Sequence, residues 1–570
     1  MIGSLFRKAR QLAGDPTLRR WLAGRAVGRY PGQPAFAAHR PAYLDGLLPL
    51  RLETPTARFS ELPDRRPATP IEIPLPGETV RVEPGAEAFL FDRAFADPEA
   101  AIAVHRFAWL PILGASVDPA WVGALWSAWL ERFAETDSGP AWHPYTAAER
   151  AINLLAYARS AGLPGPVDAT MARLARHAPA IAERLEYFGD HHTSNHLANN
   201  GRGLFLLGLA LGLPGAAEIG GRILLAEASR ILLPSGILRE GSSHYHLLLA
   251  RAYASAWLAA RAHRRPETPA LEAIVARMIA VIPRLSLPGG FPLIGDVSPD
   301  CPPAFLAGLD PSAPTDSGWL AGLGADRAAI LGLRDRVAPV ANDALAADGW
   351  LRADRGPWSG LWHVAPAGFA AMPGHGHQDT GSFELHHESV PVFRDPGRGA
   401  YGDTGAAAHF RSAASHNAVT VDGHDPFPPN KPYYDATFRR AVAGPPPRLV
   451  RDGDTVHVEH DGFARLGRVG QASRAWHFDG RAVRIGDRLD GAGRHRICRR
   501  LHTTLTVETV GDTLVLAGGG RRFRVVPDRP ARIQPTTYWS AYGVGAPATV
   551  IEIAEDATLP WTATLTIEAL

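Results

Sequence analysis

The first half of the chain, from about Pro119 to Leu287, repeats its apolar residues with the period of an α-helix. One face of the segment "PAWVGALWSAWLERFAE" is apolar, through Val122, Leu125, Trp126, Trp129 and Phe133. Similar segments follow as far as "PALEAIVARMIAVIPRL", and they are separated by Pro and Gly residues, which end helices. This succession predicts antiparallel helical hairpins stacked into a bundle or toroid.

From about Trp350 the pattern changes to short runs in which apolar and polar residues alternate. Examples are "TVHVEH", "AVRIGDRL", "TLVLAG" and "TATLTIEAL", with Gly, Asp and Pro turns between the runs. This pattern is typical of an antiparallel β-sandwich. The predicted fold is therefore a multidomain α and β protein, an N-terminal (α/α) toroid followed by a C-terminal antiparallel β-sandwich. We expect an N-terminal extension packing on the toroid (1–100), the toroid itself (101–335) and the sandwich (336–570).

Composition narrows the class of protein. A chain of 570 residues with 46% hydrophobic content is too long for one ordinary core, which agrees with at least two domains. The formal net charge of +2 argues against a nucleic-acid binder with a broad cationic face. Cys301 and Cys498 lie far apart and predict neither a disulfide framework nor a Cys-rich zinc module.

The first residues, "MIGSLFRKARQLAGDPTLRRW", are basic but contain no apolar region of signal-peptide length. No apolar run is long enough to span a membrane. We therefore expect a soluble, cytoplasmic protein, or a periplasmic one if the start site is misassigned or export is non-standard.

The segment "GHGHQDTGSFEL" (374–385) places His375, His377 and Asp379 at alternate positions before an alternating run. If this segment is extended, the three side chains point to one side. Asp395 follows at a strand-to-turn transition, and His416 precedes a further alternating run.

Two imidazoles and a carboxylate from His377, Asp395 and His416 suit Zn²⁺, with water or a fourth ligand completing a tetrahedron. The alternative is a set of hydrogen-bonded histidines and a turn aspartate without metal.

The segment "FGDHHTSNHLANNGRG" (188–203) crowds Asn195, His196, Asn199 and Asn200 at the approach to a helix. Asn and His side chains can donate hydrogen bonds to a carboxylate. The alternative is a helix-capping segment with solvated polar residues.

A third segment, "LREGSSHYHLLLARAY" (238–253), places Tyr245 between His244 and His246 where a Gly-Ser loop enters a helix, with Arg251 within two turns. Either Tyr245 faces a binding site, or it packs on an amphipathic helix. Asp296, which ends the apolar run of "FPLIGD", is interpreted as a turn residue.

These residue types suit the β-elimination of a polysaccharide that contains uronic acids. Such an enzyme must neutralise the uronate carboxylate, for which Asn and His donors are suited. It must also supply a base for the C5 proton and an acid for the departing O4 oxygen, and Tyr and His can exchange protons in this way.

The chain resembles the heparinase II/III family of polysaccharide lyases, which includes alginate-lyase relatives. The resemblance is carried by "SNH", "REGSSHYH" and "FPLIGD" in the first half and by "GHGHQDTGSFEL", "VFRDPGRGAYGD" and "SHNAVTVDG" in the second. It implies a toroid and a β-sandwich with the cleft between them, and a uronate-containing anionic polysaccharide as substrate.

The resemblance also implies roles for individual residues. Asn195 and His196 would bind the uronate carboxylate, Tyr245 would be the principal proton-transfer residue, and His375 would be its partner from the sheet domain. A zinc ion held by His377, Asp395 and His416 would organise the site, and Asp379 would orient one of the histidines. The further predicted substrate-binding residues are Asn199, Glu240, Arg251, Tyr401 and Arg411.

Two positions depart from the family pattern. Asn199 lies where relatives often carry Glu, and Gly399 lies where they often carry Tyr. Two other hypotheses stay open: a non-catalytic glycan-binding or exopolysaccharide-assembly protein that retains the lyase fold, and a metal-dependent hydrolase that uses the His-Asp-His centre directly. If Tyr245 is the base, we expect a neutral-to-alkaline pH optimum, since the ordinary pKa of tyrosine is about 10.

Overall fold

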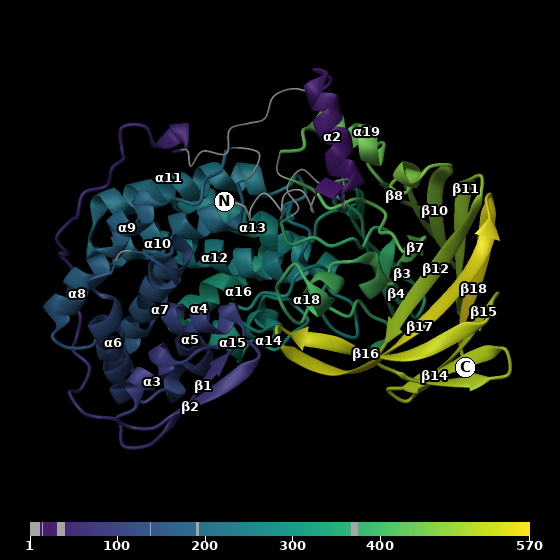
Figure 1. The fold of residues 1–570 in the computed structure, drawn as a ribbon. Helices are drawn as coiled ribbons and strands as arrows, with labels where there is room; N and C mark the ends of the chain where they lie inside the picture. Colours follow the sequence, from purple (N-terminus) through teal and green to yellow (C-terminus); the bar gives the residue numbers. More distant parts are fainter. Residues whose placement is uncertain are drawn as a thin grey trace.

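The structure is a computed structural model that describes residues 12–13, 15–30, 40–136, 138–189, 193–365, 374–431 and 433–570. The chain forms a helical half and a sheet half that lie side by side (Figure 1). The predicted fold class, helices followed by antiparallel sheets, is confirmed.

The long helices of the helical half are α6 (Pro119–Phe133), α7 (Pro144–Ala161), α10 (Asn195–Leu211), α11 (Pro214–Ile231), α12 (Ser243–Ala262) and α13 (Thr268–Leu285). Shorter helices complete it: α3 (Glu87–Asp92), α4 (Pro98–Arg106), α5 (Trp109–Leu113), α8 (Val167–Ala175), α9 (His177–Glu183), α14 (Pro303–Leu306), α15 (Gly318–Ala321), α16 (Arg327–Arg336) and α17 (Asn342–Ala347). A small hairpin of β1 (Ile71–Leu75) and β2 (Glu78–Val82) packs against these helices.

Glycines let the helical hairpin of α10 and α11 close tightly. A Cβ atom at Gly208 would lie 2.4 Å from the backbone nitrogen of Ala217, and one at Gly220 would lie 2.3 Å from that of Phe205. Real Cβ atoms do not approach so closely, so the spacing of these two helices depends on residues without side chains. This packing fixes α10, whose N-terminus carries Asn195.

Within its described residues, the sheet half contains three antiparallel sheets. Two have four strands each: β3 (Trp350–Arg355), β4 (Trp358–His363), β5 (Ser382–His387) and β6 (Val390–Phe393); and β16 (Ala531–Ala541), β17 (Val544–Thr558), β12 (Arg494–Thr503) and β7 (Val419–Val421). The third has eight strands: β13 (Thr506–Val510), β14 (Thr513–Gly518), β15 (Arg521–Pro527), β18 (Trp561–Ala569), β11 (Ala482–Gly491), β10 (Val469–Phe478), β9 (Thr455–His460) and β8 (Arg448–Asp452).

The large sheet packs its apolar face on the two smaller sheets. Trp358 and Trp362 of β4 share one core with Trp476 of β10, Leu501 of β12 and Ile551 of β17. Side chains along β9 and β10 are buried alternately, and Val456, Val458, Trp476 and Phe478 among them lie in this core. Two short helices, α18 (Gly405–His409) and α19 (Ala436–Ala443), lie in the connections.

One part of the N-terminal extension packs on the helical half, as expected, and another part packs on the sheet half. Ile73 and Val80 of its β-hairpin are buried in the core of the helical half. Helix α2 (Pro16–Ala26) instead packs on α19 of the sheet half, where Tyr30 lies 5.0 Å from Phe438 between ring centroids. Aromatic residues on the N-terminal segment and on α19 explain this packing. The local sequence pattern does not predict it.

The extended geometry considered for the segment that begins at residue 374 is not found. Residues 374–381 form a loop, and β5 begins only at Ser382. The alternating parity of His375, His377 and Asp379 therefore does not place them on one face of a strand. No helix in the described ranges is both long and apolar enough to cross a membrane.

Candidate active site

The candidate site lies where the N-termini of two helices meet loops of the sheet half. The Ser194 hydroxyl caps α10 by accepting from the His196 N–H at 3.3 Å, and the Ser242 hydroxyl caps α12 by accepting from the Tyr245 N–H at 3.1 Å. Serine is favoured at this position because it satisfies a free helical N–H. The local sequence therefore fixes the first turns that carry Asn195 and Tyr245.

Asn195 connects the helical half to His375 of the sheet half. Its backbone N–H and its Nδ2 both donate to the Glu240 carboxylate, at 2.7 and 2.9 Å, and Nδ2 also lies 2.9 Å from His375 Nε2. The His375 backbone N–H donates to the Glu240 carbonyl oxygen at 3.0 Å. Buried Glu240, which the sequence predicted to bind substrate, therefore holds Asn195 and the His375 loop together.

Asp296 is the carboxylate that orients the histidine loop. Its Oδ2 lies 3.0 Å from His375 Nδ1, its Oδ1 lies 2.7 Å from His377 Nε2, and Arg398 donates to Oδ1 as well. Burial alone would raise the pKa of Asp296, but the hydrogen bonds from His375 and His377 hold that pKa well below its usual range. Asp296 is thus an anion at the centre of the site, and its interpretation as a turn residue missed this role.

The contacts of His375 define its tautomer. The Asp296 carboxylate can only accept, so Nδ1 carries the proton; the Asn195 amide donates to Nε2, so Nε2 keeps its lone pair. His375 thus presents the lone pair of Nε2 to Asn195, and Glu240 Oε2 lies 3.4 Å from the same nitrogen.

Tyr245 lies against the same imidazole. The rings of Tyr245 and His375 stack with centroids 3.4 Å apart and planes inclined by 15°. The Tyr245 hydroxyl shares a hydrogen bond of 2.7 Å with the Tyr401 hydroxyl, which also reaches the Val297 carbonyl oxygen at 3.2 Å. Burial raises the pKa of Tyr245 well above its ordinary value, and the charges of Asp300 and Asp296 raise it further. The phenol is therefore protonated at neutral pH.

The hairpin of β16 and β17 supports the Tyr401 loop from the other side. The Tyr542 hydroxyl at the tip of the hairpin accepts from the Tyr401 N–H at 3.0 Å, and Tyr542 packs with Leu293 and Val297 of the helical half. Figure 1 shows the hairpin extending towards the helices. A Cβ atom at Gly399 would lie 2.4 Å from the ring of Trp539, so the tryptophan occupies the space that a larger residue 399 would need.

His196 and Glu186 form a second charged pair at the site. His196 Nδ1 lies 2.6 Å from Glu186 Oε1, and Asn200 Nδ2 donates to the other carboxylate oxygen at 3.0 Å. The His196 side chain is 43% exposed, whereas Glu186 is buried. Burial lowers the pKa of His196, but the carboxylate of Glu186 outweighs it and raises that pKa above its ordinary value. His196 is therefore an accessible imidazole of the site whose charged form is favoured by Glu186.

The three predicted metal ligands lie near one another, but two of them bond to carboxylates. His416 Nδ1 lies 2.8 Å from Asp395 Oδ2, and the rings of His416 and His377 have centroids 5.1 Å apart. Among the described residues, no three His, Cys, Asp or Glu side chains are arranged as a metal site. His377 Nδ1 and His416 Nε2 are nevertheless buried without a hydrogen-bond partner. Asp379 orients His363, at 3.0 Å, rather than one of these histidines.

Other predicted residues lie outside this cluster. The Asn199 side-chain oxygen accepts from Arg202 at 3.2 Å, and buried Arg251 lies 4.0 Å from Glu149, so both belong to a charged network inside the helical half. Arg411 is exposed and pairs with Asp403 at 2.7 Å. None of these contacts reaches the His375 imidazole.

The histidines beside Tyr245 anchor the start of α12. His244 Nδ1 accepts from the Ser298 N–H, and His246 bonds to the Leu238 N–H and the Met278 carbonyl. Burial lowers the pKa of His244 to about 3 and that of His246 to about 4, so both are neutral. Residues 190–192 of the Asn-rich segment lie outside the described residues.

Sequence reasoning missed Glu186, Arg398 and Tyr542. Glu186 and Tyr542 sit among unremarkable polar and aromatic residues, and only their contacts reveal them. Arg398 lies inside the quoted segment "VFRDPGRGAYGD", where a conspicuous arginine after the Asp-Pro-Gly turn was the available signal.

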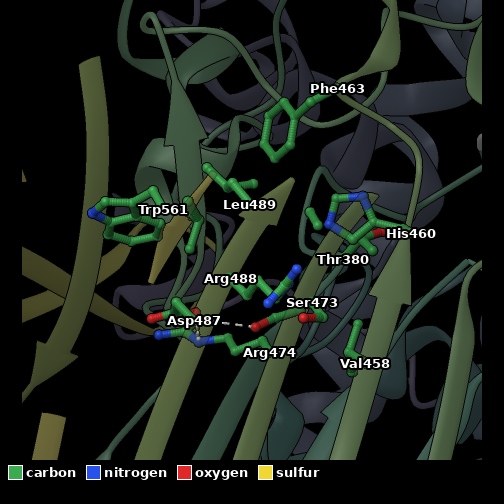
Figure 2. A pocket seen from close by; sticks show the side chains of 13 residues that line it. Thr380, Val458, His460, Phe463, Ser473, Arg474, Asp487, Arg488, Leu489 and Trp561 are labelled. Carbon is green, nitrogen blue, oxygen red and sulfur yellow. Dashed lines mark hydrogen bonds and ion pairs between the residues drawn. The ribbon is translucent and has the colours of Figure 1, made fainter. Parts of the chain in front are cut away.

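A separate small cavity lies inside the sheet half (Figure 2). Its volume is about 20 Å³, and the residues that line it include His460, Arg474, Asp487 and Trp561. The buried Asp487 carboxylate pairs with Arg474 at 3.0 Å. A volume of this size accommodates about one water molecule and is too small for a sugar ring.

Comparisons with known proteins bear on the family and the fold. Residues 339–561 match the family model described as "Heparinase II/III-like, C-terminal". The sheet half is therefore a heparinase II/III-like C-terminal domain, and the resemblance to the heparinase II/III family is confirmed.

Among solved structures, the chain is similar to heparan sulfate lyase HepC from Pedobacter heparinus, with 15% identity and a TM-score of 0.52 over 83% of this chain and 77% of that one. It is also similar to a structure of heparinase III, with 14% identity and a TM-score of 0.60 over 84% and 79%. These likenesses show a shared fold. A comparison with curated protein sequences finds no match.

Proposed function

We propose that this protein is a polysaccharide lyase that cleaves a uronic-acid-containing anionic polysaccharide by β-elimination. The observation that carries the proposal is the 2.9 Å contact of Asn195 Nδ2 with His375 Nε2, with the Tyr245 ring stacked on the same imidazole. An amide donor, an imidazole and a protonated phenol are thus available around one point. The match of residues 339–561 to a heparinase II/III-like domain and the shared fold with a heparan sulfate lyase support the same class of reaction.

In this mechanism, Asn195 and His196 neutralise the uronate carboxylate. Both protons of the Asn195 amide are engaged in the structure, one by Glu240 and one by His375. The substrate carboxylate would replace His375 as the second acceptor, while the exposed His196 cation pairs with the same carboxylate. These donors stabilise the negative charge that grows on the carboxylate as the C5 proton leaves.

His375 Nε2 is the base in this proposal. Displacement from Asn195 frees its lone pair, and the Nδ1–H donated to Asp296 holds the ring in the correct tautomer. When Nε2 takes the C5 proton, the Asp296 carboxylate stabilises the resulting imidazolium. The C5 electrons form the C4–C5 double bond, and the C4–O4 bond breaks.

Tyr245 is the acid. Its raised pKa keeps the phenol proton at neutral pH, so it can protonate the departing O4 oxygen. This assignment differs from a tyrosine base, for which a cationic environment would have to lower the pKa of the phenol. Tyr401, which shares the phenol hydrogen bond, positions the Tyr245 hydroxyl.

Zinc remains part of the proposal. The donor set fits zinc, because His377 and His416 each present a buried nitrogen without a partner and Asp395 lies beside His416. His377, Asp395 and His416 would hold the ion, which would fix the loop that carries His375 rather than act on substrate.

The test is incubation of the folded, zinc-loaded protein with a panel of polyuronides and glycosaminoglycans while ultraviolet absorbance is followed. The expected product carries an unsaturated uronate, which mass spectrometry identifies as a fragment pair without added water. Saturated products that disappear on chelation would favour the hydrolase hypothesis. Binding of a glycan without any cleavage, unchanged in Tyr245→Phe, would favour a non-catalytic glycan-binding or assembly protein.

A further inference from the structure

A groove lies on the helical half, at the ends of α6 and α9. Its volume of about 570 Å³ falls within the range of ligand-binding clefts, about 300–1,000 Å³. Residues along it include Leu52, Trp142, Arg176, Glu183 and Arg184. None of these residues belongs to the candidate active site described above.

Two short stretches of chain link residues of the groove to residues of that site. Trp142 precedes His143, whose Nε2 lies 3.6 Å from Glu186 Oε1, the same oxygen that bonds to His196. Arg184 lies two residues before Glu186 on the segment that follows α9. Figure 1 shows α7, α9 and α10 next to one another, and these helices contact each other. The groove residues Trp142 and Arg184 are therefore close in the chain to His143 and Glu186, which lie around His196.

The cations of the groove are available to an anion. Within the described part of the chain, the Arg184 guanidinium has no hydrogen-bond or ion-pair partner. Arg176 is exposed, and its nearest carboxylate, Glu135, is 4.0 Å away and is already bonded to Arg173 at 2.7 Å. Glu183 is the opposing acidic residue on the groove, and it is exposed to solvent.

We infer that this groove is a further binding site for the polymer, where Arg176 and Arg184 hold anionic groups of sugar units next to the uronate at His196. The inference rests on the proposed function, and it implies that the protein recognises an extended anionic chain rather than an isolated disaccharide. Carboxylates and sulfates would both pair with guanidinium groups.

The test compares long and short ligands. In the Tyr245→Phe background, in which turnover should be strongly slowed, binding of a long non-sulfated polyuronate, a long sulfated glycosaminoglycan and a uronate disaccharide is measured by calorimetry. The double variant Arg176→Ser/Arg184→Ser should weaken binding of at least one long polymer about tenfold and should reduce its salt dependence. Binding of the disaccharide should not change. The polymer that is affected identifies carboxylate or sulfate as the bound group.

Arg173→Ser is the matched control, because Arg173 is a neighbouring, partly exposed arginine that does not line the groove. Arg184→Gln is a second, milder variant in case the double variant unfolds. The inference would be overturned if the parent and the double variant bound both polymers with equal affinity, or if the double variant lost as much affinity for the disaccharide as for the polymer. It would also be overturned if the parent bound none of the probes. Because the readout is binding, a loss in the double variant would support the groove even if no polymer is cleaved.

Discussion

The phenol ring of Tyr245 stacks on the imidazole of His375 with centroids 3.4 Å apart, although the two residues come from different halves of the chain. Tyr245 is fixed by the Ser242 cap of α12, and His375 is fixed by Asp296 and by the Glu240 backbone. The site therefore depends on how the two halves dock as much as on either half alone.

The first prediction concerns the acid. Tyr245→Phe should lower kcat about 10²–10⁴-fold with little change in KM, because the phenol proton is needed only when O4 departs. Steady-state kinetics on the best polymer of the panel measures this. The control is Tyr253→Phe, another buried tyrosine of α12, whose hydroxyl bonds to the Leu224 carbonyl oxygen. A Tyr245→Phe variant with normal kcat would remove Tyr245 from the reaction.

The second prediction concerns the tautomer of His375. Asp296→Asn should lower kcat about 10²-fold or more and leave KM nearly unchanged, because the amide no longer fixes the proton on Nδ1 while Asn195 and His196 still bind the carboxylate. Asp310→Asn removes another buried carboxylate, one that accepts from Ser286 and Ser312, and should leave kcat unchanged. If both variants lose kcat equally, loss of stability rather than His375 orientation explains the effect.

The third prediction is a pH dependence set by Glu186. The pKa of His196 is raised by Glu186, so its positive charge persists to higher pH than in an isolated histidine and is lost as the pH rises through that pKa. kcat/KM should therefore fall on the alkaline side while kcat does not. Glu186→Gln should move this fall to lower pH by about one unit, because the opposite charge is gone. An alkaline limb at the same pH in both proteins would contradict the assignment.

The same pair makes a stability prediction with a defined sign. The pKa of Glu186 is lowered by His196 despite burial, and that of His196 is raised by Glu186. The pair therefore stabilises the fold between these two pKa values and loses its contribution as the pH falls through the first or rises through the second. The difference in Tm between the wild type and Glu186→Gln should be largest in this window and should shrink on both sides.

The fourth prediction concerns zinc. Protein prepared with zinc should contain about one ion per chain, and chelation should lower its Tm, since a bound ion stabilises the folded state. His416→Ala should lose the ion, as measured by elemental analysis, without relying on activity. A wild-type protein with no bound metal and an unchanged Tm after chelation would remove zinc from the proposal.

The fifth prediction concerns Gly399. Gly399→Ala should lower the free energy of unfolding by about 1–3 kcal/mol, because its Cβ would collide with the Trp539 ring. In a Trp539→Ala background the same change should cost much less, and denaturant unfolding of the four proteins gives the coupling. Additive effects would show that Trp539 is not the obstacle.

The sequence by itself determined that the first half of the chain is helical and the second half is built of strands, and it identified most of the chemical groups of the candidate site. Helical and alternating hydrophobic periods identify the helices and strands, because each element must bury one face. Asn195, Tyr245 and His375 stand out because polar residues cluster around them, at the starts of two helices and in a loop. The sequence could not place the loop of His375 correctly, since a Gly-rich segment has no period that distinguishes a loop from a strand.

Only the tertiary structure decided which groups act together. Asp296 looked like a turn residue until its carboxylate met His375, His377 and Arg398 from a distant part of the chain. Glu186, Tyr542 and the docking of α2 on α19 are likewise contacts between segments that are remote in sequence. Local patterns report how a segment buries its own surface, whereas the partner of a buried charge is set by the packing of the whole chain.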